Sequence, residues 1–282
     1  RKRAEAERAR KAREAKAERE RIAKEKAEKA LLAKRRAEFE AKKREEARKK
    51  EEEIVRAKAE RERLAAEKKR KAEETRKAAD AKKAKALAEN LTSQGSKVIA
   101  IKADSTKPED IRNAISETIE QLGQIDIVVN NSGTLIWDSI ENLTMYDWDK
   151  TINTNVRSVF VAIHEAAKHM NNNGRIINIS STNTQRIPFA GGSIYGMSKS
   201  ALTGLVKGLS RDLGSRGITV NNILPGPVDT DLNPDNGDTS EPVKAIGALG
   251  RYGQVEEIAS LVAFVARSEA GYITGADLMI DG

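Results

Sequence analysis

Polar and apolar residues follow two different patterns along this chain of 282 residues. Ala, Glu, Lys and Arg dominate roughly the first third, and neither glycine nor proline occurs before Gly95. All four residue types are strong helix formers, and no helix breaker interrupts them. The pattern predicts one continuous helix, which at about 1.5 Å per residue would be roughly 135 Å long for about 90 residues.

The few large apolar residues of this first segment do not form a sustained seam. Leu32 and Phe39 are seven residues apart, but the heptad spacing then lapses. Glutamates often precede lysines by four residues, as Glu25 precedes Lys29, and such pairs stabilise an isolated helix. The segment therefore resembles the charged single α-helices of the ER/K type that serve as rigid spacers.

The composition of this helix bears on three other roles, of which it favours one and disfavours two. An alanine row at Ala23, Ala30 and Ala37 offers a surface for a partner helix. Binding to nucleic acid is disfavoured, because acidic residues are mixed in throughout and interleaved aromatic residues are missing. Binding to a membrane surface is disfavoured because the helix has no apolar face.

From about residue 78 onward, short apolar runs alternate with amphipathic segments. Runs such as "IVV" and "RIINI" are typical of strands buried on both faces, and strict alternation of strands with helices predicts a parallel, doubly wound sheet. We therefore expect an α/β fold over 78–282, preceded by a long charged helix over 1–77. The expected strands are 97–104, 125–129, 174–181, 218–226 and 276–280, and the expected helices are 80–95, 107–123, 145–170, 193–215 and 255–269.

Charge and composition narrow the functional classes. The net charge of +8 hides two opposite parts: the first 90 residues carry 35 Lys and Arg against 21 Asp and Glu, a balance of +14, whereas the rest carries 16 against 22, a balance of −6. The chain has no cysteine and two histidines, His164 and His169, which argues against disulfides and a metal centre. The longest apolar run, 261–266, is far short of the ~18 residues that a membrane span needs. These features favour a cytoplasmic protein.

Polar residues gather where the predicted strands end. "NNSG" follows the strand at 125–129, "SS" ends the strand at 174–181, and "PGPVDT" follows the strand at 218–224. Because ligand sites of such sheets lie beyond the carboxyl ends of the strands, we expect these segments to line one site. The next helix carries Tyr195 and Lys199, four residues apart and so on the same face. A neighbouring ammonium lowers the pKa of a phenol, although a surface Tyr beside a surface Lys would have the same spacing.

Taken together, residues from about 78 to 282 resemble the short-chain dehydrogenase/reductases, in particular the branch of 3-oxoacyl-carrier-protein reductase-like enzymes. The active-site Tyr-x-x-x-Lys of that family matches Tyr195 to Lys199. The resemblance implies that Ser181 is the catalytic serine, with Ser180 as the alternative, and that Asn155 is the catalytic asparagine.

The chemistry of carbonyl reduction fits these residues. Tyr195 would supply a proton to the carbonyl oxygen, and Lys199 would lower the pKa of the phenol and bind ribose hydroxyls. Ser181 would hold the substrate oxygen, and Asn155 would anchor a water. For the serine and the asparagine, a purely structural role as a turn cap or a backbone ligand is the alternative.

The resemblance also implies a cofactor, NAD or NADP, and a carbonyl or secondary alcohol as substrate. Asp104 matches the position that contacts adenine, and Pro225, Gly226, Val228 and Thr230 match the turn that holds the carboxamide. The Asn-Asn-Ala-Gly segment of the family appears as Asn130, Asn131, Ser132 and Gly133, with serine in the third place. Homo-oligomers are a further expectation from the resemblance.

One part of the family pattern has no counterpart here. The family begins with a strand, a glycine-rich phosphate-binding turn, a helix and a second strand, whereas this chain has no glycine before Gly95. In the sheet order of the family, the two strands would lie between 98–103 and 125–129. Without them, either the segments 98–103 and 125–129 pair with each other, or another chain fills the gap, or the domain folds poorly. The alternative to an enzyme is therefore a rigid spacer fused to a catalytically inert reductase-like domain.

Overall fold

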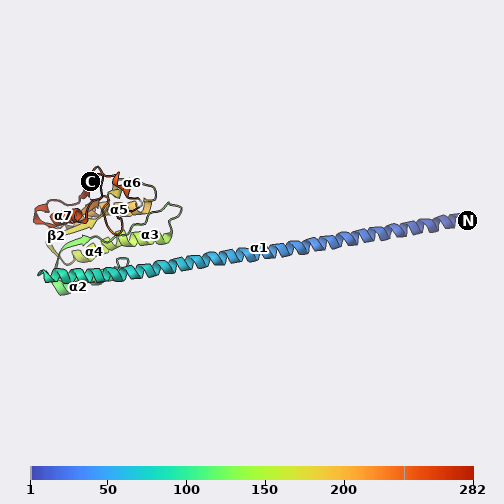
Figure 1. Cartoon of the computed structure of the whole chain (residues 1–282), viewed down its shortest axis with the longest axis horizontal. Helices are drawn as coiled ribbons and strands as arrows, with labels where there is room; N and C mark the ends of the chain where they lie inside the picture. Colours follow the sequence, from blue (N-terminus) through green and yellow to red (C-terminus); the bar gives the residue numbers. More distant parts are fainter. Residues whose placement is uncertain (1, 238) are drawn as a thin grey trace. The chain divides into compact units, whose positions relative to one another are not determined.

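The structure, a computed structural model, describes residues 2–237 and 239–282 (Figure 1). The chain divides into two compact units, Arg1–Lys82 and Lys83–Gly282. Among the described residues, no helix combines the length and the apolar character that crossing a membrane requires.

The first unit consists of most of the helix α1 (Lys2–Ser93), which runs without interruption for 92 residues (Figure 1). Ion pairs between side chains one turn apart accompany it, among them Lys29 Nζ to Glu25 Oε1 at 2.7 Å. The helix ends where Gly95 adopts a positive φ of 92°, a conformation that L-residues with a side chain rarely adopt. The predicted long helix is present, and the separate helix expected over 80–95 is the last part of the same helix.

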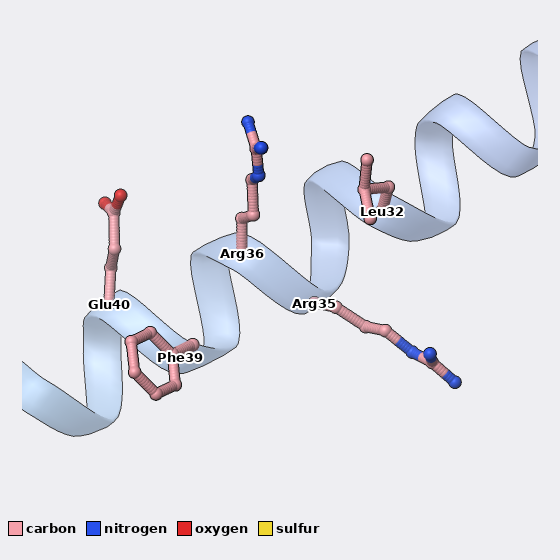
Figure 2. Close-up of a pocket in the computed structure, with 5 residues that line it drawn as sticks. All are labelled: Leu32, Arg35, Arg36, Phe39 and Glu40. Carbon is pink, nitrogen blue, oxygen red and sulfur yellow. The ribbon is translucent and has the colours of Figure 1, made fainter.

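The large apolar residues of α1 project into solvent. The side chains of Leu32 and Phe39 are 56% and 69% exposed. With Arg35, Arg36 and Glu40 they border a shallow hollow, and Figure 2 shows all five fanning outward from successive turns of one helix. Because a single helix bounds this hollow, it encloses no binding site.

The second unit is a parallel sheet between layers of helices (Figure 1). Its elements are α2 (Pro108–Leu122), β1 (Ile125–Asn130), α3 (Met145–Ile152), α4 (Ser158–Ala167), β2 (Met170–Ile179), α5 (Ser193–Gly214), β3 (Thr219–Pro225), α6 (Ser240–Lys244), α7 (Val255–Ala266) and β4 (Asp277–Ile280).

The four strands pair in the order β1-β2-β3-β4, and every pair is parallel. One core joins the sheet to α2, α4 and α5 through residues such as Ile119, Ile163, Ile176 and Val206. A second core joins the opposite face to α7 through Ile177, Ile223 and Val265 and their neighbours.

The helix expected over 145–170 is divided by a π-helical turn at Asn153–Arg157. There the backbone N–H of Ser158 donates to the carbonyl of Asn153, five residues earlier. The turn widens the helix at Asn155, one of the predicted site residues. Periodicity alone did not indicate it, since one added residue leaves the apolar pattern on both sides intact.

The prediction of a strand over 97–104 is wrong. These residues connect α1 to α2 without joining the described sheet, although Val98, Ile99 and Ile101 are half-buried. A strand exists only with a partner, and none of the four described strands pairs with this segment. Of the three outcomes expected for the gap, the pairing of 98–103 with 125–129 does not occur.

Strand β1 is consequently an edge of the described sheet. Ile127 and Val129 are 48% and 44% exposed, whereas Val128 packs on the core that includes α2 and α4. Strands of parallel sheets are normally covered on both faces, and an uncovered apolar edge invites pairing with another chain.

A row of three side-chain amides and one carboxylate crosses the four described strands. Asn130 Nδ2 donates to Asn178 Oδ1 at 2.8 Å, Asn178 Nδ2 to Asn222 Oδ1 at 3.1 Å, and Asn222 Nδ2 to Asp277 Oδ1 at 2.8 Å. The four residues are also register partners in the backbone ladder. Asn178 and Asn222 are fully buried, so each amide depends on its neighbours for hydrogen bonds. We call these four residues the amide ladder.

Replacing the central amide should destabilise the second unit strongly. Asn178→Leu keeps the volume but leaves Asn130 and Asn222 short of a partner in a buried site, so we expect a loss of about 2–4 kcal/mol in the free energy of unfolding. Denaturant unfolding followed by circular dichroism measures it. Asn171→Ala, which removes an exposed hydrogen bond to Asp126 from the same strand, is the control and should cost less than about 0.5 kcal/mol. Equal effects of the two changes would contradict the importance of the ladder.

The two faces of β1 should respond oppositely to charge. Val129→Lys places an ammonium on the exposed face and should reduce self-association at unchanged stability, because charges on an edge strand oppose pairing. Val128→Lys places it against the core and should lower the melting temperature. Sedimentation velocity and thermal unfolding of both variants test this; an equal loss of stability in both would contradict the exposure of the face that carries Val129.

Candidate active site

The carboxyl ends of the strands bring three predicted segments to one side of the sheet. β1 leads into Ser132 and Gly133, β2 into Ser180 and Ser181, and β3 into the turn at 225–230. Helix α5 begins nearby and supplies Tyr195 and Lys199. No three His, Cys, Asp or Glu side chains come together as a metal centre would need within 2–237 and 239–282.

Lys199 is buried at the centre of this group. Its Nζ donates to the carbonyl of Ile179, the last residue of β2, at 2.9 Å, and the Ser180 hydroxyl donates to the Lys199 carbonyl at 3.2 Å. Burial lowers the pKa of Lys199 from 10.5 to about 8. An ammonium has three N–H bonds, so Nζ keeps donors for a further acceptor.

Tyr195 lies beside the lysine, with the Lys199 Nζ 6.0 Å from the centroid of its ring. Burial raises the pKa of Tyr195 above 10, and a hydrogen bond with Ser181 offsets part of this rise. The pKa of the phenol is therefore raised rather than lowered in the protein alone, and Ser181 is the neighbour that offsets the effect of burial. Sequence spacing placed Tyr195 and Lys199 together, and the lowering of the phenol pKa by Lys199 stays a prediction.

The two candidate serines have different partners. Ser181 interacts with Tyr195, and its Oγ accepts a hydrogen bond from the backbone N–H of Asn183 at 3.2 Å. Ser180 turns instead to the backbone of Lys199. Of the two, Ser181 is the one with its hydroxyl at the phenol.

Asn155 joins the site through the backbone of the segment after β1. Its Oδ1 accepts from Thr134 N at 2.8 Å, and its Nδ2 donates to Thr134 O and to Ser198 Oγ, both at 3.0 Å. The amide is thus fully engaged with protein atoms, which is the structural role that we gave as the alternative to holding a water. It fixes Thr134, and at the preceding residue, Gly133, an added Cβ would lie 3.4 Å from Lys199 Nζ and 3.6 Å from Asn155 Oδ1.

The residues predicted to contact a cofactor occupy two places. At the end of β3, Gly226 packs so closely on Asp281 that a Cβ would meet its backbone at 2.8 Å, while Val228 bridges to Gly253 and Thr230 to Asn233. Pro225, the last residue of β3, precedes this turn and accepts a hydrogen bond from Thr182 Oγ1.

The second place is the start of α2. The Asp104 carboxylate accepts hydrogen bonds from the backbone N–H and the hydroxyl of Thr106, and so shapes the turn into the helix. Ser132 Oγ lies 3.3 Å from Ser105 Oγ, which connects this turn to the end of β1. Asn130 is the first member of the amide ladder, so its side chain is engaged within the sheet.

Sequence analysis missed three contributors to this site. Ser198 binds the Asn155 amide, Asn178 holds Asn130, and the Trp137 ring lies 6.3 Å from the Tyr195 ring between centroids. Asparagines inside apolar strands, as in "RIINI", were the available signal for the ladder. Trp137 gave no signal, because its contact with Tyr195 joins a loop to a helix 58 residues further along the chain.

The residues present fit one half of a nicotinamide dinucleotide. The spare donors of the buried Lys199 and the close-packed turn at 225–230 suit a ribose and a carboxamide. The glycine-rich turn that would bind the pyrophosphate has no counterpart, because the chain has no glycine before Gly95 and helix α1 occupies that part of the sequence.

Comparison with known proteins gives consistent matches. The family model described as "Enoyl-(Acyl carrier protein) reductase" matches residues 62–282. The short-chain dehydrogenase/reductase from Serratia marcescens BCRC 10948 is 53% identical with a TM-score of 0.71, over 72% of this chain and 82% of that chain. A short-chain dehydrogenase from Burkholderia cenocepacia J2315, solved in complex with NADP, is 44% identical with a TM-score of 0.71, over the same shares. The cyclic-di-GMP-binding biofilm dispersal mediator protein of Escherichia coli K12 is 42% identical over 61% of this chain and 72% of its own.

The depressed pKa of Lys199 should appear in the pH dependence of stability. Between pH 8 and 10.5 the unfolded chain binds more protons at this lysine than the folded chain, so the free energy of unfolding rises with pH in this window. The expected slope is about 1.4 kcal/mol per pH unit at most. Urea unfolding at pH 7 to 10 should show this slope in the wild type and in Lys207→Met, a control on the exposed face of α5, but not in Lys199→Met. Parallel curves for all three would contradict the burial of the ammonium.

Proposed function

We propose, from the premise that this chain belongs to the short-chain dehydrogenase/reductase family, that residues 78–282 form an oxidoreductase acting on a carbonyl or a secondary alcohol. The observation that carries the proposal is the grouping of Ser181, Tyr195 and the buried Lys199 where β2 ends. We further propose that residues 1–77 are a rigid helical spacer, because α1 exposes its apolar residues and carries ion pairs along its length.

NADP or NAD is the proposed cofactor, and it supplies the hydride when bound. Relatives that were solved with NADPH or NADP support this assignment. Tyr195 and Lys199 would hold the nicotinamide ribose, and the turn with Pro225, Gly226, Val228 and Thr230 would hold the carboxamide. Asn130, Ser132 and Gly133 would line the path of the nucleotide, with Asp104 toward the adenine.

The side chains of this site suit proton transfer to a carbonyl oxygen. The raised pKa of Tyr195 keeps the phenol protonated at neutral pH, as a general acid requires. Lys199, with a pKa of about 8, carries a charge at pH 7 and would stabilise the phenolate that forms. Ser181, already hydrogen-bonded to the phenol, would donate its hydroxyl to the same substrate oxygen. Asn155 would position Gly133 and Lys199 rather than touch the substrate.

A second candidate function rests on a specific observation. The chain has no glycine before Gly95, and β1 ends the described sheet on the side where the family places its phosphate-binding unit. A domain without that unit would be a reductase-like fold that does not turn over substrate.

Homo-oligomers, which the family often forms, are part of the first proposal.

Tyr195→Phe separates binding from chemistry. The ring and its packing remain while the transferable proton is lost, so we expect kcat to fall at least about 100-fold with little change in the Kd for NADPH. Tyr272→Phe, which alters a fully exposed tyrosine, is the matched control and should change neither. Full activity of Tyr195→Phe would refute the assignment.

A titration with NADPH and NADH, followed by nicotinamide fluorescence, decides between the two functions. Saturable binding in the micromolar range supports the oxidoreductase and ranks the two cofactors. No binding to a chain that circular dichroism shows to be folded supports the inert domain.

A further inference from the structure

Trp137 lies in the connection from β1 to α3 and forms one side of the space beside Tyr195. The two ring centroids are 6.3 Å apart and the planes are tilted by 47°. The indole is half-buried, so one part of it remains accessible. A molecule that presents a carbonyl to the Tyr195 phenol therefore meets this ring.

Two hydrogen bonds hold the indole in place. Its Nε1 donates to the carbonyl of Ala190 at 2.6 Å, and the next backbone N–H, of Asp138, donates to the carbonyl of Gly191 at 3.1 Å. These bonds tie the loop after β1 to the loop before α5. The polar atom of the indole is thereby satisfied, and its ring surface is left for apolar contact.

Glycines allow the indole to lie against the backbone of the second loop. A Cβ at Gly191 would lie 2.8 Å from the indole Cδ1, and one at Gly192 would lie 2.6 Å from Cη2. Gly191 also has a φ of 98°, which disfavours any side chain. The Ile187 Cγ2 lies 2.7 Å from the same Cβ position of Gly192, so Ile187 and Trp137 are neighbours. We call these two residues the apolar wall.

The carboxylate next to Trp137 in the sequence is engaged away from this wall. The nearest carboxylate in sequence, Asp138, accepts hydrogen bonds from Ser139 N at 2.7 Å and Asn142 Nδ2 at 3.0 Å and so closes its own turn. A fixed aromatic ring with a satisfied N–H and an aliphatic neighbour favours planar, uncharged groups.

We propose that Trp137 is a specificity-determining residue that selects substrates with an aromatic ring next to the reacting carbonyl or carbinol carbon. The inference rests on the proposed function for its catalytic meaning, but binding to the wall is measurable without turnover. Aromatic pairs gain affinity beyond area burial, so we expect about a three- to ten-fold preference for an aryl over a cyclohexyl group.

The first experiment uses tryptophan fluorescence. The chain has two tryptophans, Trp137 and Trp148, so Trp148→Phe makes Trp137 the sole reporter. This variant is titrated with 1-phenylethanol and with 1-cyclohexylethanol, which have the same carbon skeleton. A saturable change with a lower Kd for 1-phenylethanol supports the proposal. Equal Kd values, or no saturable change with either alcohol, overturn it.

The second experiment uses Trp137 variants with acetophenone and cyclohexyl methyl ketone. Trp137→Leu should bring the ratio of the two kcat/KM values close to one through KM, whereas Trp137→Phe, which keeps a ring, should retain most of the preference. Loss of kcat alone, equally for both ketones, would mean a merely structural role and would overturn the proposal. Selective binding of 1-phenylethanol without turnover of either ketone would refute the proposed function and leave the apolar wall in place.

Discussion

The amide ladder is the constraint on which the rest of the second unit depends. A parallel sheet without turns between its strands has little local chemistry to set the register, and a slip by one residue would exchange the two faces of a strand. Asn130, Asn178, Asn222 and Asp277 hydrogen-bond only when they lie opposite one another. In that register β2 ends at Ile179, whose carbonyl receives the Lys199 ammonium, and Ser181 follows at the phenol. The position of the reactive groups is thus set by amides inside the sheet.

In this site, backbone carbonyls rather than carboxylates accept hydrogen bonds from the Lys199 ammonium and the Asn155 amide. Lys199 is buried against one carbonyl, and the Asn155 side-chain amide hydrogen-bonds to Thr134 and Ser198. Desolvation therefore dominates both titratable groups: it depresses the pKa of the lysine and raises that of the tyrosine. Both shifts favour the uncharged forms, so a phenolate and an ammonium face each other only once a reacting oxygen takes the proton.

Sequence reasoning succeeded where a single local pattern decided the structure. The absence of breakers predicted α1, the helix expected over 107–123 is α2 (Pro108–Leu122), and Tyr195 and Lys199 came together because a helix puts i and i+4 on one face. It failed where a partner decided. Residues 97–104 have the composition of a strand but pair with no described strand, and the polar residues of the ladder look unfavourable until all four are aligned. The contact of Trp137 with Tyr195 depends on a loop and a helix that only the folded chain brings together.

Helix α1 and the sheet depend on different forces, and this difference has a consequence for the molecule in solution. The pairs along α1, such as Glu45 with Lys49 and Glu67 with Lys71, are exposed, so added salt screens them within a Debye length of about 8 Å at 0.15 M ionic strength. The buried apolar groups of the sheet are indifferent to such screening. Raising the ionic strength therefore weakens the ion pairs along α1 and leaves the apolar contacts of the sheet unchanged, so that the stability of one part of the chain depends on the solution around it and that of the other on its own interior.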